Sequence, residues 1–392
     1  MCSYTLFYQP AKVVKKSSAM REISGNHVYA VIMAGGFGKK LWPVSRRKMP
    51  KQFADLLDDG TMIAKTLRRI SGLVPEENIF IITSELGRKL LSDTLVNFKE
   101  GNIIVEPSSR NTAPCIALAT AHIKKRDPDA VTIVLPSDHL VLDDQAFIKI
   151  VEAGIKIAQG KKGLVTLGIK PDRPETAYGY IQADGELPLP PPFSESLDCQ
   201  LFRVKAFAEK PDSATAEVFL ESKDFFWNSG IFIWHIDAIS REFERSMPDL
   251  YKDLLDIYES LGTEREHKVI EDVYSWIHPL SIDYGIMEKA DKVFVLTGEF
   301  GWTDLGCWDE VLKVAGSRSV FSGEHPDNRL VQIDCKNVFV KNPSGKVVCT
   351  IGIEDVIIVE TEDALLICRK GESHRVREVV DILRREGLDD YL

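Results

Sequence analysis

A short apolar run that breaks into glycines is the feature that most constrains this chain. Residues 30–34 read AVIMA, and three glycines follow: Gly35, Gly36 and Gly38. This pattern predicts a buried strand that ends in a tight turn facing an anion. No acidic residue occurs between Gly35 and Ala54, although the whole chain has a formal net charge of −10. We therefore predict a polyphosphate site in this stretch.

The same stretch is strongly basic and fits neither of two common glycine-loop motifs. Its cationic residues are Lys39, Lys40, Arg46, Arg47, Lys48 and Lys51. A dinucleotide-binding fingerprint needs a third glycine at position 41, which is Leu41 here. A Walker loop needs serine or threonine directly after its glycine–lysine pair, but Lys40 follows Lys39. The loop therefore belongs to another class of phosphate site, and a surface turn with a basic face is the alternative.

Composition limits the class of protein. With 392 residues, 44% of them hydrophobic and 28% charged, the chain is long enough for one large domain and a smaller one. No apolar run approaches the length of a membrane span, and no secretory segment is recognisable, so we expect a cytoplasmic protein without a membrane partner. Seven widely spaced cysteines without a CxxC pair predict neither disulfides nor zinc. The acidic net charge argues against nucleic-acid binding.

Strands and helices are expected to alternate between residues 29 and 141. The predicted strands are 29–33, 79–83, 102–105 and 130–135, and the predicted helices are 61–71, 87–98 and 111–125. Alternation of this kind predicts an α/β, Rossmann-like, doubly wound sheet with helices on both faces. Ligands of such sheets bind beyond the carboxyl ends of the strands.

Polar residues follow two of these strands. After the strand 102–105, Arg110, Asn111 and Thr112 open a helix, where backbone donors and a cation can meet a phosphate or a base. Helix capping by Asn111 or Thr112 is the alternative. After the strand 130–135, Asp138 is well placed to hold Mg²⁺. The neighbouring His139 is equally well explained by packing.

The middle of the chain offers further candidates. Gly179 lies between two tyrosines, where backbone can approach a ligand or another strand. Glu209 and Lys210 are adjacent, so both reach one ligand only if their strand ends there, as Pro211 suggests. The proline-rich residues 186–193 predict an exposed hairpin or loop.

Three polar residues come later. Asn228 lies in WNSG and Asp283 in SIDYG, and a strand is expected at 293–296. Asp304 lies in a WTDLG turn, far in sequence from Asp138, as a second metal-ligating carboxylate would.

Taken in order, these segments resemble a known family. MAGG, KLWP, the SR pair and PKQF resemble the signature of sugar-nucleotide pyrophosphorylases, and mannose-1-phosphate guanylyltransferases above all. The resemblance covers about residues 29–308 and includes RNTAP, EKP, WNSG, SIDYG and WTDLG. It implies a nucleotidyltransferase fold of the GT-A-like type, with a mixed sheet.

The resemblance also implies roles for individual residues. The nucleotide-binding set is Ala34, Gly35, Gly36, Gly38, Arg110, Asn111, Thr112 and Pro136. The sugar-phosphate set is Gly179, Glu209, Lys210, Asn228 and Asp283. Lys40 and Lys51 bind the polyphosphate as catalytic residues, and Asp138 and Asp304 hold Mg²⁺. One departure is that the family usually has arginine where this chain has Lys40, and a lysine lacks the planar bidentate contact.

The reaction that the resemblance implies is GMP transfer from GTP to mannose 1-phosphate, by in-line attack on the α-phosphorus. Two alternatives stay open. One is a sugar nucleotidyltransferase with another base or sugar, because the physical chemistry of the residues does not choose the base. The other is a non-catalytic regulatory homologue, which the Lys40 replacement favours and the presence of Asp138, Asp304 and Lys51 opposes.

Three domains are predicted: an extension over residues 1–27, the catalytic domain over 28–315 and a small β-rich domain over 326–392. The last of these ends in a helix over 373–386 with Ser373 as a possible N-cap. It resembles the β domain of the guanylyltransferases and is too short for their additional isomerase module. Its strand edges can pair between subunits, so a homodimer is a hypothesis that a monomer mass in light scattering would rule out.

Overall fold

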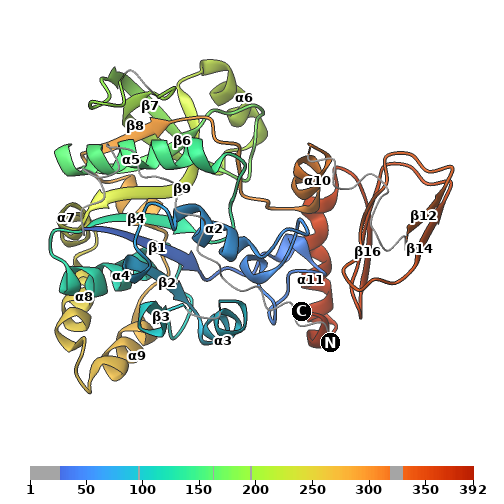
Figure 1. The fold of residues 1–392 in the computed structure, drawn as a ribbon, viewed down its shortest axis with the longest axis horizontal. Helices are drawn as coiled ribbons and strands as arrows, with labels where there is room; N and C mark the ends of the chain where they lie inside the picture. The colour runs from blue at the N-terminus through green and yellow to red at the C-terminus, as the bar shows by residue number, and fades with distance from the viewer. Residues whose placement is uncertain (1–26, 96–97, 162, 195–196, 318–329) are drawn as a thin grey trace. The chain divides into compact units, whose positions relative to one another are not determined.

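The computed structural model describes residues 27–95, 98–161, 163–194, 197–317 and 330–392 (Figure 1). Except for His27, the predicted N-terminal extension lies outside the described residues. The chain divides into two compact units. Unit 1 consists of residues up to Gly35, Leu67–Ser137 and Val141–Trp302; unit 2 consists of Gly36–Thr66, Asp138–Leu140 and Thr303–Leu392.

Unit 1 is built around one twisted sheet with the strand order β3-β2-β1-β4-β9-β6-β10-β8-β7 (Figure 1). The strands are β1 Val28–Ala34, β2 Ile79–Thr83, β3 Ile103–Val105, β4 Val131–Pro136, β6 Leu164–Ile169, β7 Gly179–Leu187, β8 Leu201–Glu209, β9 Phe225–His235 and β10 Val293–Thr297. The first four strands in this order are parallel, whereas β9 runs antiparallel to β4 and β6. The predicted mixed α/β sheet is thus confirmed.

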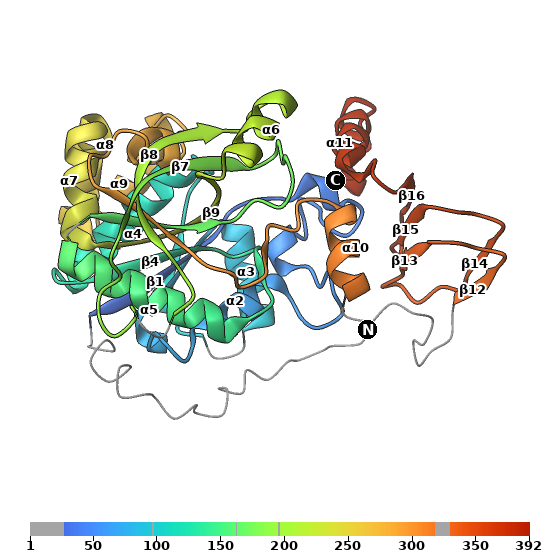
Figure 2. The same ribbon diagram turned by 90° about the horizontal axis from the view of Figure 1, so that it is seen from above.

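Helices cover both faces of this sheet, which explains why β1 is almost continuously apolar (Figure 2). On one face, α4 packs with α7 and α8; on the other, α5 packs on β4, β6 and β9. The helices of this unit are α3 Glu85–Thr94, α4 Thr112–Arg126, α5 Asp144–Lys161, α6 Ser213–Ser222, α7 Ile236–Ser246, α8 Pro248–Ser260 and α9 Glu266–Trp276, with a π-helical turn at Asp283–Met287.

A close contact anchors the end of β1 beside α3. The hydroxyl of Thr83 donates to the carbonyl of Ala34 (2.9 Å), and a Cβ added to Gly87 would lie 1.9 Å from that hydroxyl oxygen. Gly87→Ala is therefore expected to lower the free energy of unfolding by about 2 kcal/mol through overpacking, measured by urea denaturation. Gly160→Ala, in α5 where a Cβ has open space, is the control and should stabilise the protein by about 0.5–1 kcal/mol. An unchanged free energy in Gly87→Ala would contradict the prediction.

Unit 2 has a core of its own, centred on two tryptophans. The indole N–H of Trp308 donates to the carbonyl of Trp42 (2.9 Å), and that of Trp42 donates to the carbonyl of Tyr391 (2.8 Å).

The strands of unit 2 are β12 Leu330–Ile333, β13 Phe339–Lys341, β14 Val348–Ile351, β15 Val356–Glu360 and β16 Leu365–Arg369, and its helices are α10 Trp308–Ser317 and α11 Val376–Arg385. The β-rich C-terminal part followed by a helix was expected from the sequence. The short elements α2 Met62–Ile70, β5 Leu140–Val141 and β11 Trp302–Thr303 fall at the boundaries between the units.

One local expectation was wrong and another is made more specific by the structure. Ser373 does not cap α11, which begins at Val376; its hydroxyl accepts from the N–H of Asp309 (2.9 Å). The proline-rich segment belongs to a hairpin, one of the two expected alternatives, because β7 continues to Leu187 and pairs antiparallel with β8. The prolines begin directly after that strand, where no ladder hydrogen bond is needed.

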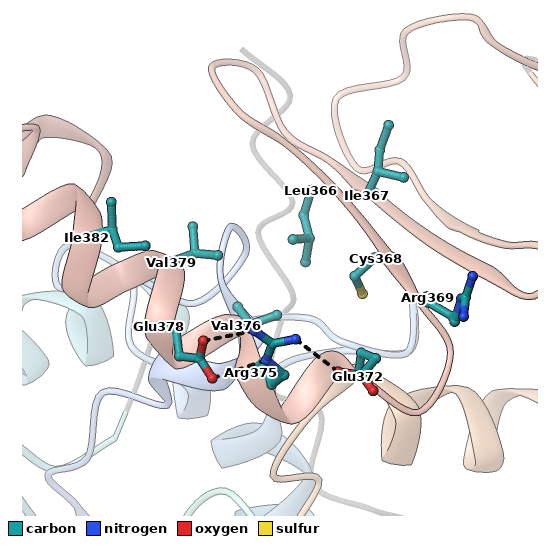
Figure 3. A pocket seen from close by; sticks show the side chains of 10 residues that line it. All are labelled: Leu366, Ile367, Cys368, Arg369, Glu372, Arg375, Val376, Glu378, Val379 and Ile382. Carbon is teal, nitrogen blue, oxygen red and sulfur yellow. Dashed lines mark hydrogen bonds and ion pairs between the residues drawn. The ribbon is translucent and has the colours of Figure 1, made fainter.

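A groove in unit 2 lies between β16 and α11 (Figure 3). Arg375 pairs there with Glu372 (3.3 Å) and Glu378 (3.2 Å). None of the residues that line this groove was predicted to belong to the functional site.

Among the described residues, no helix is long and apolar enough to cross a membrane. The described cysteines are all free thiols.

Candidate active site

The glycine-rich turn wraps around a buried lysine. Gly38 has a φ of 65°, and a Cβ there would lie 2.5 Å from Cβ of Lys51 and 3.1 Å from Oγ of Ser45. Both the left-handed backbone and the close approach require glycine at this position. Ser45 in turn donates to the carbonyl of Phe37, which closes the turn.

Lys51 joins three segments of unit 2 that are far apart in sequence. Its side chain is 6% exposed, and Nζ lies 2.9 Å from Oδ2 of Asp138 and donates to the backbone carbonyl of Asp304. Burial by itself would raise the pKa of Asp138, but the Lys51 ammonium and the His139 imidazole beside it hold that pKa below its ordinary value. The structure thus brings Lys51 together with both predicted metal-ligating aspartates.

Lys40 is placed differently from Lys51. It lies in the 3₁₀ turn Lys39–Leu41, is half-buried, and has no hydrogen bond or ion pair within the described part of the chain. Gly35 and Gly36 before it are exposed, and Ala34 is buried at the end of β1.

The described residues contain no preformed metal cage around the two aspartates. No group of three or more His, Cys, Asp or Glu side chains among the described residues is arranged to hold a metal ion. Mg²⁺ is commonly held by one or two carboxylates, with substrate phosphates and water as its other ligands. The assignment of Asp138 and Asp304 to Mg²⁺ therefore stays a prediction.

Four predicted sugar-phosphate residues meet in unit 1. Gly179 at the start of β7 is paired with Glu209 at the end of β8, and a Cβ on Gly179 would lie 2.5 Å from Oε2 of Glu209 and 3.5 Å from Cβ of Asn228. The amide Nδ2 of Asn228 donates to Oδ1 of Asp283 (2.7 Å). A side chain at position 179 would collide with the Glu209 carboxylate, so glycine allows Glu209 and Asn228 to approach this backbone closely.

Lys210 stands at the edge of this cluster. Strand β8 ends at Glu209 as expected, and Lys210 has a φ of 47°. Its side chain is 64% exposed, and its Nζ lies 3.3 Å from Oε1 of Glu209.

The start of α4 is occupied by structural contacts. The Oδ1 of Asn111 accepts from the N–H of Thr112 (2.8 Å), so Asn111 is the N-cap, as the alternative interpretation held. The Thr112 hydroxyl accepts from the N–H of Ile282 (2.8 Å), and Nε of Arg110 donates to the carbonyl of Tyr274 (3.0 Å). Arg110 and Thr112 therefore tie this turn to other parts of unit 1. Pro136 ends β4 in the same unit.

Comparison with known proteins identifies the family. The family model "Nucleotidyl transferase" matches residues 29–318, and "MannoseP isomerase/GMP-like beta-helix domain" matches residues 328–383. Mannose-1-phosphate guanylyltransferase 2 of Escherichia coli O157:H7 is 35% identical over 371 residues, covering 93% of this chain and 75% of that protein. Mannose-1-phosphate guanylyltransferase of Salmonella montevideo is 35% identical over 366 residues, covering 92% and 75%.

The chain belongs to the mannose-1-phosphate guanylyltransferase family.

A solved structure agrees with this assignment. The crystal structure of "mannose-1-phosphate geranyltransferase" from Thermus thermophilus superposes with a TM-score of 0.77 at 31% identity, covering 91% of this chain and 99% of that chain. The predicted resemblance, the nucleotidyltransferase class of the enzyme and its fold are confirmed.

One buried acid of this nucleotidyltransferase was not among the predicted site residues. Glu106 directly follows β3 and is 8% exposed, and the hydroxyl of Tyr274 donates to its Oε1 (3.0 Å). Burial raises the pKa of Glu106 to about 7. A carboxylate placed directly after a strand was the sequence signal for it, but its partner Tyr274 lies in α9, far along the chain.

The burial of the Asp283 carboxyl makes the free energy of unfolding depend on pH. Burial raises the pKa of its carboxyl to about 6, the Glu209 carboxylate adds to the rise, and the hydrogen bond from Asn228 opposes it. The folded protein therefore holds this proton more tightly than the unfolded chain does. Its contribution to stability is greatest below the unfolded pKa and is lost as the pH rises through the folded pKa.

Asp283→Asn should therefore stabilise the protein at pH 8 by about 1–3 kcal/mol and leave its stability unchanged at about pH 3, below the unfolded pKa, because each pKa unit corresponds to about 1.4 kcal/mol. The asparagine carbonyl can still accept the hydrogen bond from Asn228. Urea unfolding of both proteins across this pH range checks the prediction. A variant that is equally destabilised at both ends would show that Asp283 is primarily structural.

Proposed function

We propose that this enzyme transfers GMP from GTP to mannose 1-phosphate, giving GDP-mannose and pyrophosphate. The observation that carries the proposal is the convergence of Gly179, Glu209, Asn228 and Asp283, which offers hydroxyl-binding carboxylate and amide groups beside a glycine. The names of the relatives support the choice of mannose 1-phosphate as acceptor and guanylyl as the transferred group.

The proposed chemistry is a single in-line displacement. A phosphate oxygen of mannose 1-phosphate forms a bond to the α-phosphorus of GTP, and the bond from that phosphorus to the bridging oxygen breaks. Pyrophosphate leaves with the electron pair. The sugar phosphate is already a nucleophile, so the protein's contribution is positioning and charge stabilisation.

The residues keep their expected roles in this proposal. Lys40 and Lys51 interact with the polyphosphate, and Asp138 and Asp304 would hold Mg²⁺. A bound Mg²⁺ would neutralise phosphate charge as a Lewis acid. The nucleotide-binding set is the one predicted from the sequence: Ala34, Gly35, Gly36, Gly38, Arg110, Asn111, Thr112 and Pro136. Lys210 joins the four converging residues on the sugar phosphate.

The proposal also includes a catalytic domain over residues 28–315 and a small β-rich domain over residues 326–392. It further includes a homodimer and a cytoplasmic location. The mass of the particle in light scattering tests the dimer.

The function is tested by pyrophosphate release from purified protein with Mg²⁺. GTP, ATP, dTTP and UTP are each combined with the 1-phosphates of mannose, glucose and fucose. Turnover confined to GTP with mannose 1-phosphate is the expected result. Turnover with another pair would keep the mechanism and change the substrate, and no turnover with intact nucleotide binding would instead indicate a regulatory homologue.

A further inference from the structure

An arginine–aromatic cluster lies directly beside the sugar-phosphate residues of unit 1. Arg173 lies in the loop between β6 and β7, and its guanidinium carbon is 4.9 Å from the ring centroid of Trp227 and 5.9 Å from that of Tyr178. Tyr178 packs edge-on against Trp227 and against Trp302, with centroid distances of 5.2 Å in each case. The cluster therefore links the loop to the strands on which the site is built.

The cluster is connected to the site through neighbouring backbone positions. Trp227 directly precedes Asn228 on β9, and Tyr178 directly precedes Gly179 at the start of β7. Contacts that hold either aromatic side chain in place also restrain the backbone that carries the next residue. Asn228 has little freedom to absorb such a shift, because its Nδ2 donates to Asp283 and its Oδ1 accepts from the N–H of Gly230 (3.1 Å).

The ring of Trp227 is held by packing alone. It is 4% exposed, and its indole N–H has no hydrogen-bond partner among the described residues. Its orientation must therefore come from the groups that touch its faces and edge. A guanidinium over the face and an aromatic ring at the edge are favourable contacts of this kind.

The charge on Arg173 is balanced by two neighbouring acids. Nη1 lies 3.0 Å from Oδ1 of Asp172, and Nη2 lies 3.2 Å from Oε2 of Glu175. Glu175 also accepts from the N–H of Ala177 (3.1 Å), and its backbone carbonyl accepts from the hydroxyl of Tyr180 (2.9 Å). A guanidinium neutralised in this way is suited to bracing the loop and poorly suited to binding a phosphate.

We propose that Arg173 is a positioning residue for the sugar-phosphate side of the active site. By stacking on Trp227 while it is paired with Asp172 and Glu175, it sets the backbone positions of Asn228 and Gly179. The inference rests on the proposed function, because it takes these two residues as part of the sugar-phosphate set.

The test compares Arg173→Lys, Glu175→Gln and the control Arg88→Gln with the wild type. Lysine keeps the charge of Arg173 but lacks the flat guanidinium that stacks on the indole. Arg88 is matched because it is also a partly exposed arginine paired with two carboxylates, Glu85 and Glu100. Steady-state pyrophosphate release gives KM for each substrate, and calorimetry gives the affinities for GDP-mannose and GDP.

Arg173→Lys is expected to raise KM for mannose 1-phosphate and to weaken GDP-mannose binding by about tenfold, because misplaced binding groups lose affinity steeply. KM for GTP and the affinity for GDP should stay within about twofold of wild type, since uniform damage to the fold would change both substrates. Arg88→Gln should change none of these values.

Glu175→Gln distinguishes bracing from direct phosphate binding. If Glu175 helps to brace the loop, its replacement raises KM for mannose 1-phosphate. If Arg173 itself binds the phosphate, removing a competing carboxylate lowers that KM and overturns the proposal. Wild-type turnover with an unchanged KM in Arg173→Lys would overturn this inference alone, whereas a wild type without turnover or GDP-mannose binding would overturn the proposed function as well.

Discussion

Asp138→Asn is expected to lower turnover by about 10³-fold, because the proposal makes Asp138 a ligand of the Mg²⁺ that would stabilise the charge of the transferring phosphoryl group. Asp138 is held by Lys51 at 2.9 Å and has a pKa below its ordinary value, so it is an ionised carboxylate at neutral pH. Asparagine has nearly the same shape but no charge to offer to Mg²⁺. The remaining activity should also need a higher Mg²⁺ concentration. Pyrophosphate release with titrated Mg²⁺ measures both effects.

The control for this variant is Asp58→Asn. Asp58 also pairs with a buried lysine of unit 2, Lys341, whose side chain is 2% exposed. Asp58 has a φ of 57°, a left-handed backbone conformation that asparagine tolerates well. The control should lose stability to a similar extent, yet keep wild-type turnover per folded molecule. Near-full turnover in Asp138→Asn would exclude Asp138 as a metal ligand.

Lys51→Met should lower kcat/KM by about 10²–10³-fold, as expected for the loss of a cation that stabilises polyphosphate charge. It should also destabilise the protein by about 1–3 kcal/mol, because Asp138, whose side chain is 29% exposed, loses a buried cationic partner. Arginine at position 51 should not restore activity, because Gly38 packs closely against the lysine stem. Steady-state kinetics and thermal unfolding measure the two effects.

A double variant separates the two roles of Lys51. Combining Lys51→Met with Asp138→Asn removes both charges, so part of the lost stability should return while activity stays low. Lys65→Met is the matched control, since Lys65 is 5% exposed and pairs with Asp59 in the same unit. It should lose stability without losing turnover. Recovery of activity in the double variant would contradict a direct role for Lys51.

The sequence by itself determined the features that depend on neighbouring residues. The continuous apolar run of β1 predicts a strand buried on both faces, and Gly38 is required by its turn. The end of β8 at Glu209 was signalled by Pro211. The order of the motifs was sufficient to identify the family. These signals are local, because propensity, hydrophobic alternation and turn chemistry act over a few residues.

The tertiary structure alone decided which distant groups meet. It placed Lys51 between Asp138 and the carbonyl of Asp304, and it directed the Ser373 hydroxyl to Asp309 instead of a helix N-terminus. It also placed Arg173 on Trp227, which no spacing in the sequence predicts. Such contacts depend on how separate segments pack, and a side chain with several available partners takes the one that packing brings within hydrogen-bond distance.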